Sequence, residues 1–128
     1  MIVLDTHVWL WWLSEPSLLS KNASREIEKA DRIGICSISC FEVAIAVAKG
    51  RISIDRGILD WLETALAQPR VELLQITPRI AARASQLGTA FHGDPADRLI
   101  TATAMMESVP LVTKDARIRK YPGVPSIW

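Results

Sequence analysis

Two aspartates in the segment HGDPADRLITATA (92–104) are the first candidates for chemistry in this sequence. Asp94 and Asp97 bracket a proline and an alanine, and an apolar, helix-like stretch follows them. The simplest interpretation is a helix that extends to about Glu107, with Asp94 as N-cap, Pro95 as first residue and Asp97 as third. Alternatively, the pair holds a cation, because carboxylates beside a buried surface are costly unless something neutralises them. Taken alone, the segment favours the capping role.

Three further acids lie at comparable places in the chain. Asp5 directly follows the apolar segment IVL, and Asp115 follows PLVT by one residue. Glu42 lies near the start of SCFEVAIAVAKG (39–50), a helix so apolar that its single acid needs a partner. Each acid has a local alternative, because Asp5 and Asp115 are good helix caps and Ser39-x-x-Glu42 is a capping box. Four such acids together are harder to explain as caps alone.

Convergence of these acids would require a counter-charge. Two carboxylates about 4 Å apart repel by roughly 4 kcal/mol at an effective dielectric constant near 20. Several such pairs would consume much of a typical stability of about 5–15 kcal/mol. The acids would therefore either take up protons or surround a divalent cation. An all-oxygen site suits Mg²⁺ or Mn²⁺, which are typical of centres that cleave phosphodiesters.

The elements that must position these acids alternate between short apolar strands and helices. The pattern predicts strands at 2–4, 33–38, 71–76 and 110–113, with an edge strand in VPSIW, and helices at 6–13, 17–31, 39–50, 58–67, 78–91, 95–107 and 115–120. This alternation indicates a single α/β domain over residues 1–128, with a central, mainly parallel sheet flanked by helices. Ligands of such sheets bind beyond the carboxyl ends of the strands, where the acids lie.

Composition limits the environment and the partners of the chain. With 128 residues, 49% hydrophobic and 23% charged, it can form a substantial core. A net charge of +1 means that any polyanion must be held by local basic residues or through metal ions. Cys36 and Cys40 have no further metal-ligand partners and are interpreted as reduced thiols. The N-terminus MIVLD is no signal peptide and VWLWWL is too short to span a bilayer, so we expect a cytoplasmic protein without membrane contact.

Four segments together resemble PIN-domain ribonucleases, most closely the VapC-type toxins of type II toxin–antitoxin pairs. They are LDTHVWLWW (4–12), SISCFEVAIAVAKGRI (37–52), HGDPADRLITATA and LVTKDARIRKY (111–121). The resemblance implies a parallel sheet flanked by helices and metal-dependent endonucleolytic cleavage of RNA. The four acids of the family match the acid quartet of this chain: Asp5, Glu42, Asp97 and Asp115. Asp94 is the additional aspartate of the DPxDR variant, and Phe41 stands where relatives often carry Trp.

These matches give each residue an expected role. Asp5, Asp97 and Asp115 would bind one or two Mg²⁺ or Mn²⁺ ions, and Glu42 would orient a metal-bound water or bridge to a second ion. The activated water would attack phosphorus in line, and the family chemistry implies a 3′-hydroxyl leaving group. Supporting roles are expected for Asp94, Thr6 and Thr113, although all three are equally good cap or turn residues. His7 and His92 are interpreted as structural, since metal-activated water needs no histidine base.

Basic and aromatic residues suggest the partners. RNA phosphates would be bound by Arg98 and by basic residues of KDARIRK (114–120), namely Lys114, Arg117, Arg119 and Lys120, although each also fits a solvated helix face. Part of the Trp9-Leu10-Trp11-Trp12 cluster, Trp11 or Trp12, is expected at a contact surface. By resemblance, this surface would receive the C-terminal arm of a cognate antitoxin, a small DNA-binding protein, or form a homodimer seam.

Three other functions fit the sequence less well. A phosphoaspartyl enzyme would need an acid two residues after Asp5, where this chain has His7. Dinucleotide binding would need a glycine-rich turn after the first strand, and DTHVWL has no glycine. The remaining alternative is a catalytically silent interaction module of the same fold. It would explain the tryptophans but not the four acids, and divalent-metal binding would separate it from a nuclease.

Overall fold

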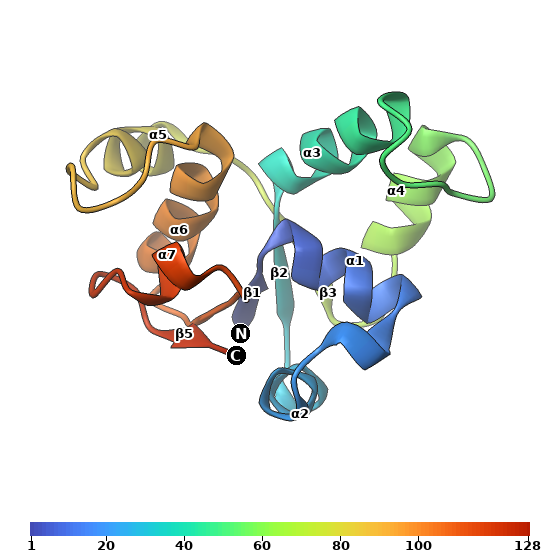
Figure 1. Cartoon of the computed structure of the whole chain (residues 1–128), viewed down its shortest axis with the longest axis horizontal. Helices are drawn as coiled ribbons and strands as arrows, with labels where there is room; N and C mark the ends of the chain where they lie inside the picture. Colours follow the sequence, from blue (N-terminus) through green and yellow to red (C-terminus); the bar gives the residue numbers. More distant parts are fainter.

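The computed structural model describes residues 1–128 and contains a five-stranded parallel sheet in the order β3-β2-β1-β4-β5 (Figure 1). The strands are β1 (Ile2–Leu4), β2 (Ile33–Cys36), β3 (Val71–Leu74), β4 (Leu111–Val112) and β5 (Ser126–Ile127). All four strand pairings are parallel, with β1 at the centre between β2 and β4. Their carboxyl ends therefore lie at one edge of the sheet.

Helices cover both faces of this sheet. They are α1 (Thr6–Ser14), the 3-10 helix η1 (Pro16–Leu18), α2 (Lys21–Lys29), α3 (Ser37–Ala48), α4 (Ile58–Leu66), α5 (Pro78–Ser85), α6 (Pro95–Glu107) and α7 (Ala116–Arg119). In Figure 1, α1, α3 and α4 lie on one side of the strands, and α5, α6 and α7 lie on the other. The α/β fold predicted from the sequence is confirmed. No helix has both the length and the apolar character that crossing a membrane would require.

Successive side chains of β1 point to opposite faces of the sheet and so belong to two different core clusters. Ile2 and Leu4 belong to one buried cluster, in which Trp9 of α1 is fully enclosed. Val3 points the other way and packs in a second cluster with Ile100 of α6. Each large apolar side chain buried in this way contributes about 1.5–3 kcal/mol. These two clusters fix the helices α1 and α6, which carry much of the acidic site, against the central strand.

Several predicted elements end earlier than the sequence pattern indicated, and two of these differences affect the site. The predicted strand 33–38 ends at Cys36, because α3 begins directly at Ser37 without an intervening loop. The predicted helix 78–91 ends at Ser85, and a loop follows in which Gly88 has a φ of +82°. The Ala84 carbonyl accepts a hydrogen bond from the Arg98 side chain instead of continuing the helix. This loop, residues 86–93, turns out to form one wall of the site.

Candidate active site

The four acids of the quartet come from four different elements and lie close enough to act on one another's charge. Asp5 follows β1 and Asp115 follows the neighbouring β4, while Glu42 and Asp97 belong to α3 and α6. Negative charge on Asp5 raises the pKa of both Glu42 and Asp97, and negative charge on Asp115 raises that of Asp5. The arrangement concentrates carboxylates at the carboxyl edge of the sheet, where parallel α/β folds bind ligands.

Asp5 is buried and oriented by two hydrogen bonds. Its Oδ2 accepts a hydrogen bond of 2.7 Å from the Thr113 hydroxyl, and its Oδ1 accepts one of 2.8 Å from the Thr6 amide. Burial raises the pKa of Asp5 and outweighs these hydrogen bonds, which lower it. Asp5 is also the N-cap of α1, so the predicted capping role and a place in the acidic site coexist in one side chain.

Glu42 is held by hydroxyl groups rather than by a capping box. The helix begins two residues before Ser39, with Cys36 at the N-cap, so the predicted pairing of Ser39 with Glu42 as a capping box is wrong. Instead, the Thr6 hydroxyl donates to Oε1 of Glu42 and lies 2.8 Å from Ser39 Oγ. Burial raises the pKa of Glu42, the Thr6 hydrogen bond lowers it, and the charge of Asp5 raises it again. Thr6 thus links α1 to the acid of α3.

Asp94 and Asp97 lie where the sequence predicted them at the start of α6. Asp94 is the N-cap and accepts a hydrogen bond of 3.0 Å from the Asp97 amide, and Pro95 is the first residue. Oδ2 of Asp97 lies 2.7 Å from Nε2 of His92, and both side chains are mostly buried, at 15% and 14% exposed. Burial raises the pKa of Asp97, and the His92 hydrogen bond opposes this. His92 is therefore part of the acidic site.

Asp115 caps α7 and forms an ion pair with Arg117 of the same helix. It accepts a hydrogen bond of 2.8 Å from the Arg117 amide, and Nη2 of Arg117 lies 3.0 Å from its Oδ2. Burial alone would raise the pKa of Asp115, but the hydrogen bonds from Arg117 hold it below its usual value. The same Nη2 lies 3.8 Å from Oδ2 of Asp97. A flexible cation, 63% exposed, thus reaches two of the four acids.

One group of side chains has the spacing of metal ligands. Donor atoms of His92, Asp97 and Asp115 all lie within 4.8 Å of one another. The predicted ligand set was Asp5, Asp97 and Asp115; Asp5 is not a member of this group, and His92 is. Two carboxylates and an imidazole are a suitable donor set for a divalent cation, and the raised pKa of Asp97 marks a charge that such a cation would stabilise. The only sequence signal for His92 is its place five residues before Asp97.

Arg98, predicted to contact RNA, is committed to the protein instead. Its guanidinium donates to four backbone carbonyls at 3.1–3.2 Å, those of Ala84, Gly88, Phe91 and His92. It also lies over the Phe91 ring, 5.7 Å from the centroid. With its hydrogen-bonding capacity used in this way, Arg98 fastens the loop 86–93 rather than offering a free phosphate contact.

The other basic residues of the C-terminal segment point to different places. Besides Arg117, Lys114 is exposed and lies over the Trp11 ring, with its Nζ 5.8 Å from the centroid. Arg119 and Lys120 are exposed and line a separate hollow of about 450 Å³ that also contains Trp128. Arg117 and Lys114 are therefore the basic residues associated with the acidic site or its immediate surroundings.

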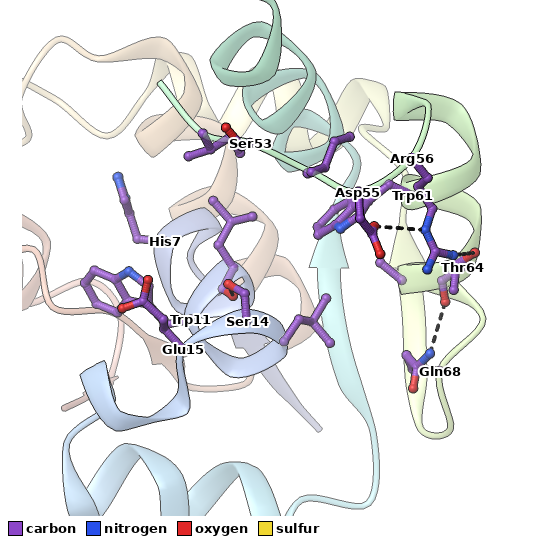
Figure 2. Close-up of a pocket in the computed structure, with 15 residues that line it drawn as sticks. His7, Trp11, Ser14, Glu15, Ser53, Asp55, Arg56, Trp61, Thr64 and Gln68 are labelled. Atoms are coloured by element: carbon purple, nitrogen blue, oxygen red, sulfur yellow. Dashed lines mark hydrogen bonds and ion pairs between the residues drawn. The ribbon is translucent and has the colours of Figure 1, made fainter. Parts of the chain in front are cut away.

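A larger groove, of about 590 Å³, lies between α1 and α4. Figure 2 shows His7 and Trp11 of α1 on one side of it, and Arg56 and Trp61 on the other. None of the quartet lines this groove, but His7 lies two residues from Asp5 and links the two regions. Of the two tryptophans expected at a contact surface, Trp11 lines the groove, whereas Trp12 packs against the core.

Known proteins are similar to this chain in sequence and in fold. The PIN domain family model matches residues 2–124. Ribonuclease VapC22 of Mycobacterium tuberculosis is 44% identical over 129 aligned residues, which cover 99% of this chain and 98% of that protein. VapBC2 from Rickettsia felis, bound to a promoter DNA fragment, has a TM-score of 0.73 at 21% identity, covering 98% and 97% of the two chains. A toxin–antitoxin complex from Klebsiella pneumoniae gives 0.70 at 21% identity, covering 97% and 95%.

The family match spans almost the whole chain, and the four segments that carry the resemblance lie in the elements that form the acidic site. Solved structures below 25% identity support the fold, while the full-length relative at 44% identity supports the closer relationship. This chain therefore belongs to the PIN-domain family, among proteins of the VapC type.

Proposed function

We propose that this chain is a Mg²⁺- or Mn²⁺-dependent endoribonuclease that acts as the toxin of a toxin–antitoxin pair, with residues 1–128 forming one nuclease domain. The observation that carries the proposal is the meeting of Asp5, Glu42, Asp97 and Asp115 at one edge of the sheet, where burial and mutual repulsion raise the pKa of three of them. The 44% identity to a protein named a ribonuclease supports the choice of RNA as substrate.

The contacts of each side chain indicate its role in the proposed reaction. Asp97 and Asp115, with Asp5 beside them, would hold the cation, which when bound supplies positive charge to the phosphodiester and acidifies a coordinated water. Glu42 keeps Oε1 engaged with Thr6, which leaves Oε2 to accept a hydrogen bond from the attacking water and so to orient it. Thr113 holds Asp5, and Asp94 holds the first turn of α6. The phosphorus–oxygen bond that breaks leaves a 3′-hydroxyl on the released strand.

RNA binding would use the exposed cations nearest the acids. Lys114 and Arg117 flank Asp115, whereas Arg119 and Lys120, at the C-terminal end of α7, line the separate hollow and would contact RNA further from the acids. Contacts of this kind bind phosphate without reading sequence and weaken as salt rises. Arg98 is left out, because its guanidinium is already bound to the loop 86–93.

The groove between α1 and α4 is our proposed seat for the antitoxin's C-terminal arm. It combines apolar residues, including Leu10, Trp11 and Trp61, with polar ones, and its lining includes His7, two residues from Asp5. Structural relatives of the fold are solved as VapBC complexes.

We also propose a homodimer, supported by the exposure of Phe41 (61%) on α3, and a cytoplasmic location, supported by two free cysteines.

Cleavage of RNA in saturating Mg²⁺ tests the site, using Asp5→Asn and Asp97→Asn variants beside the wild type. Both changes preserve the size of the side chain and one side-chain oxygen, which at Asp5 can still cap α1, so loss of activity with retained fold would point to the charge. We expect cleavage to fall by about 10²-fold or more in each variant. Near-wild-type activity in both variants would refute the assignment, and calorimetry that detects no divalent cation would favour the catalytically silent module.

A further inference from the structure

The side chain that the sequence left without a role, His92, lies in the group with metal-ligand spacing. Its Nε2 is 2.7 Å from Oδ2 of Asp97, and the donor atoms of His92, Asp97 and Asp115 lie within 4.8 Å of one another. Ligands about 2.1 Å from an octahedral ion lie about 3–4.2 Å apart. Displacement of the exposed Arg117 side chain, with a modest inward movement of the two carboxylates, would therefore place all three donors on one ion.

The imidazole is held in place before any cation arrives. Its ring stacks on Phe91, with centroids 4.4 Å apart, and the side chain is only 14% exposed. The backbone carbonyl of His92 accepts a hydrogen bond of 3.1 Å from Arg98, which also fastens the rest of the loop. Nε2 is the ring nitrogen that faces the acids, and Nδ1, which is buried without a hydrogen-bond partner, would carry the ring proton when Nε2 binds a cation. Such preorganisation favours binding because little is left to order.

A nitrogen donor changes which ion the site prefers. Mg²⁺ is bound by oxygen ligands, whereas imidazole is a common ligand for first-row transition metals. We propose that His92 is a direct ligand of the catalytic cation, together with Asp97 and Asp115, and that it biases the centre toward Mn²⁺ over Mg²⁺. The inference rests on the proposed metal-dependent function and assigns a ligand beyond the acid quartet.

The rival role for His92 is positioning, in which it only orients Asp97 through their hydrogen bond. His92→Gln separates the two roles, because the glutamine amide can still donate to Asp97 but cannot supply an imidazole nitrogen. His7→Gln is the matched control. The chain contains just these two histidines, and His7 is exposed on α1 beside Asp5.

Electron spin echo modulation of Mn²⁺ bound to the tag-free protein detects a directly coordinated nitrogen. We expect ¹⁴N modulation in the wild type and in His7→Gln, and none in His92→Gln. By calorimetry, Mn²⁺ affinity should fall about tenfold or more in His92→Gln, and Mg²⁺ affinity should fall less. If His92→Gln does not fold, His7→Gln still decides the question, because its only imidazole is His92.

The outcomes distinguish this inference from the function on which it rests. Mn²⁺ that binds the wild type without ¹⁴N modulation would overturn the ligand role and leave the proposed nuclease intact. Modulation that survives in His92→Gln and disappears in His7→Gln would also overturn it. Failure of the wild type to bind either cation would overturn both the ligand role and the proposed function.

Discussion

Neutralising Asp97 should leave the metal-free protein at least as stable as the wild type. Burial and the charges of Asp5 and Asp94 raise the pKa of Asp97, so ionising this side chain costs more free energy in the folded protein than in the unfolded chain. Its donor atom lies within 4.8 Å of that of Asp115. Two charges at that separation repel by about 0.9 kcal/mol in water and about 3.5 kcal/mol at a dielectric constant of 20. Asp97→Asn removes this repulsion.

The stabilising contacts that Asp97→Asn weakens contribute less than the repulsion it removes at a dielectric constant of 20. Asparagine keeps a carbonyl oxygen that can accept the hydrogen bond from His92, so the weakening there is about 1 kcal/mol. The ion pair with Arg117 is lost, but that guanidinium is 63% exposed and the pair contributes about 0–1 kcal/mol. At a dielectric constant of 20, the net change in the free energy of unfolding should therefore be about 1.5–2.5 kcal/mol in favour of the variant.

With a divalent cation bound, the wild type should instead be more stable than Asp97→Asn. Mg²⁺ at about 100 times its dissociation constant stabilises the protein that binds it by about 2.7 kcal/mol. The wild type should gain this amount and Asp97→Asn should gain little. Denaturant unfolding, first with a chelator and then with Mg²⁺, measures the stability of each protein without and with the cation. The control is Glu107→Gln, because Glu107 is an exposed acid at the far end of α6. This variant should respond to Mg²⁺ like the wild type.

The reasoning is refuted if the metal-free wild type exceeds Asp97→Asn in stability by more than the roughly 0.5 kcal/mol typical of surface substitutions. It is equally refuted if Mg²⁺ stabilises both proteins to the same extent. Either result would mean that the acids of the site do not repel one another enough to matter, and that the cation, if bound, does not depend on Asp97.

Three further predictions follow from other contacts of the site. Thr113→Val removes a buried hydroxyl that donates to Asp5, so urea unfolding should show a loss of about 1–3 kcal/mol, and an unchanged midpoint would contradict the contact. Arg117→Gln removes the cation that competes with a metal ion for the carboxylates of Asp97 and Asp115. Calorimetry should therefore find tighter Mg²⁺ binding, and gel-shift assays should find weaker RNA binding. An unchanged Mg²⁺ affinity would exclude such competition. Burial raises the pKa of Asp5, Glu42 and Asp97, so ionising them destabilises the folded protein. Their protonated forms therefore give the protein a stability that is fully present below the pKa values of the unfolded chain. This contribution is lost as the pH rises through the higher pKa values of the folded protein. The metal-free protein should therefore lose stability from about pH 4 toward pH 7, since exposed ion pairs contribute little in the opposite sense, and an unfolding series that shows a gain would disprove the assignment.

The fold and the meeting of the acids could be expected from the sequence because both depend on local patterns. Short apolar strands alternating with helices predict a parallel sheet, and such a sheet brings its strand ends to one edge. Asp5 and Asp115 follow neighbouring strands, and Asp94 and Pro95 mark the start of α6. None of these inferences required knowledge of contacts between distant segments beyond the sheet itself.

The errors come from features that only tertiary structure determines. Arg98 follows Asp97 in sequence, but successive residues on a helix point about 100° apart, so its side chain turns toward the loop 86–93 and away from the acids. His92 lies in that loop, where no periodicity predicts direction. Ser39 and Glu42 fit the spacing of a capping box, yet α3 starts two residues earlier because β2 leads directly into it.

Three acids near the site, Asp5, Asp94 and Asp115, each cap the helix that follows them. A short side chain with an oxygen is favoured at these positions because it caps the helix, independently of any action on RNA. An inactive descendant of this protein could therefore carry asparagine or serine there and fold unaided, whereas glutamate, equally charged but longer, would disturb helix initiation. Loss of activity during evolution would leave almost no trace in the shape of the molecule, and only the chemical identity of three side chains would reveal it.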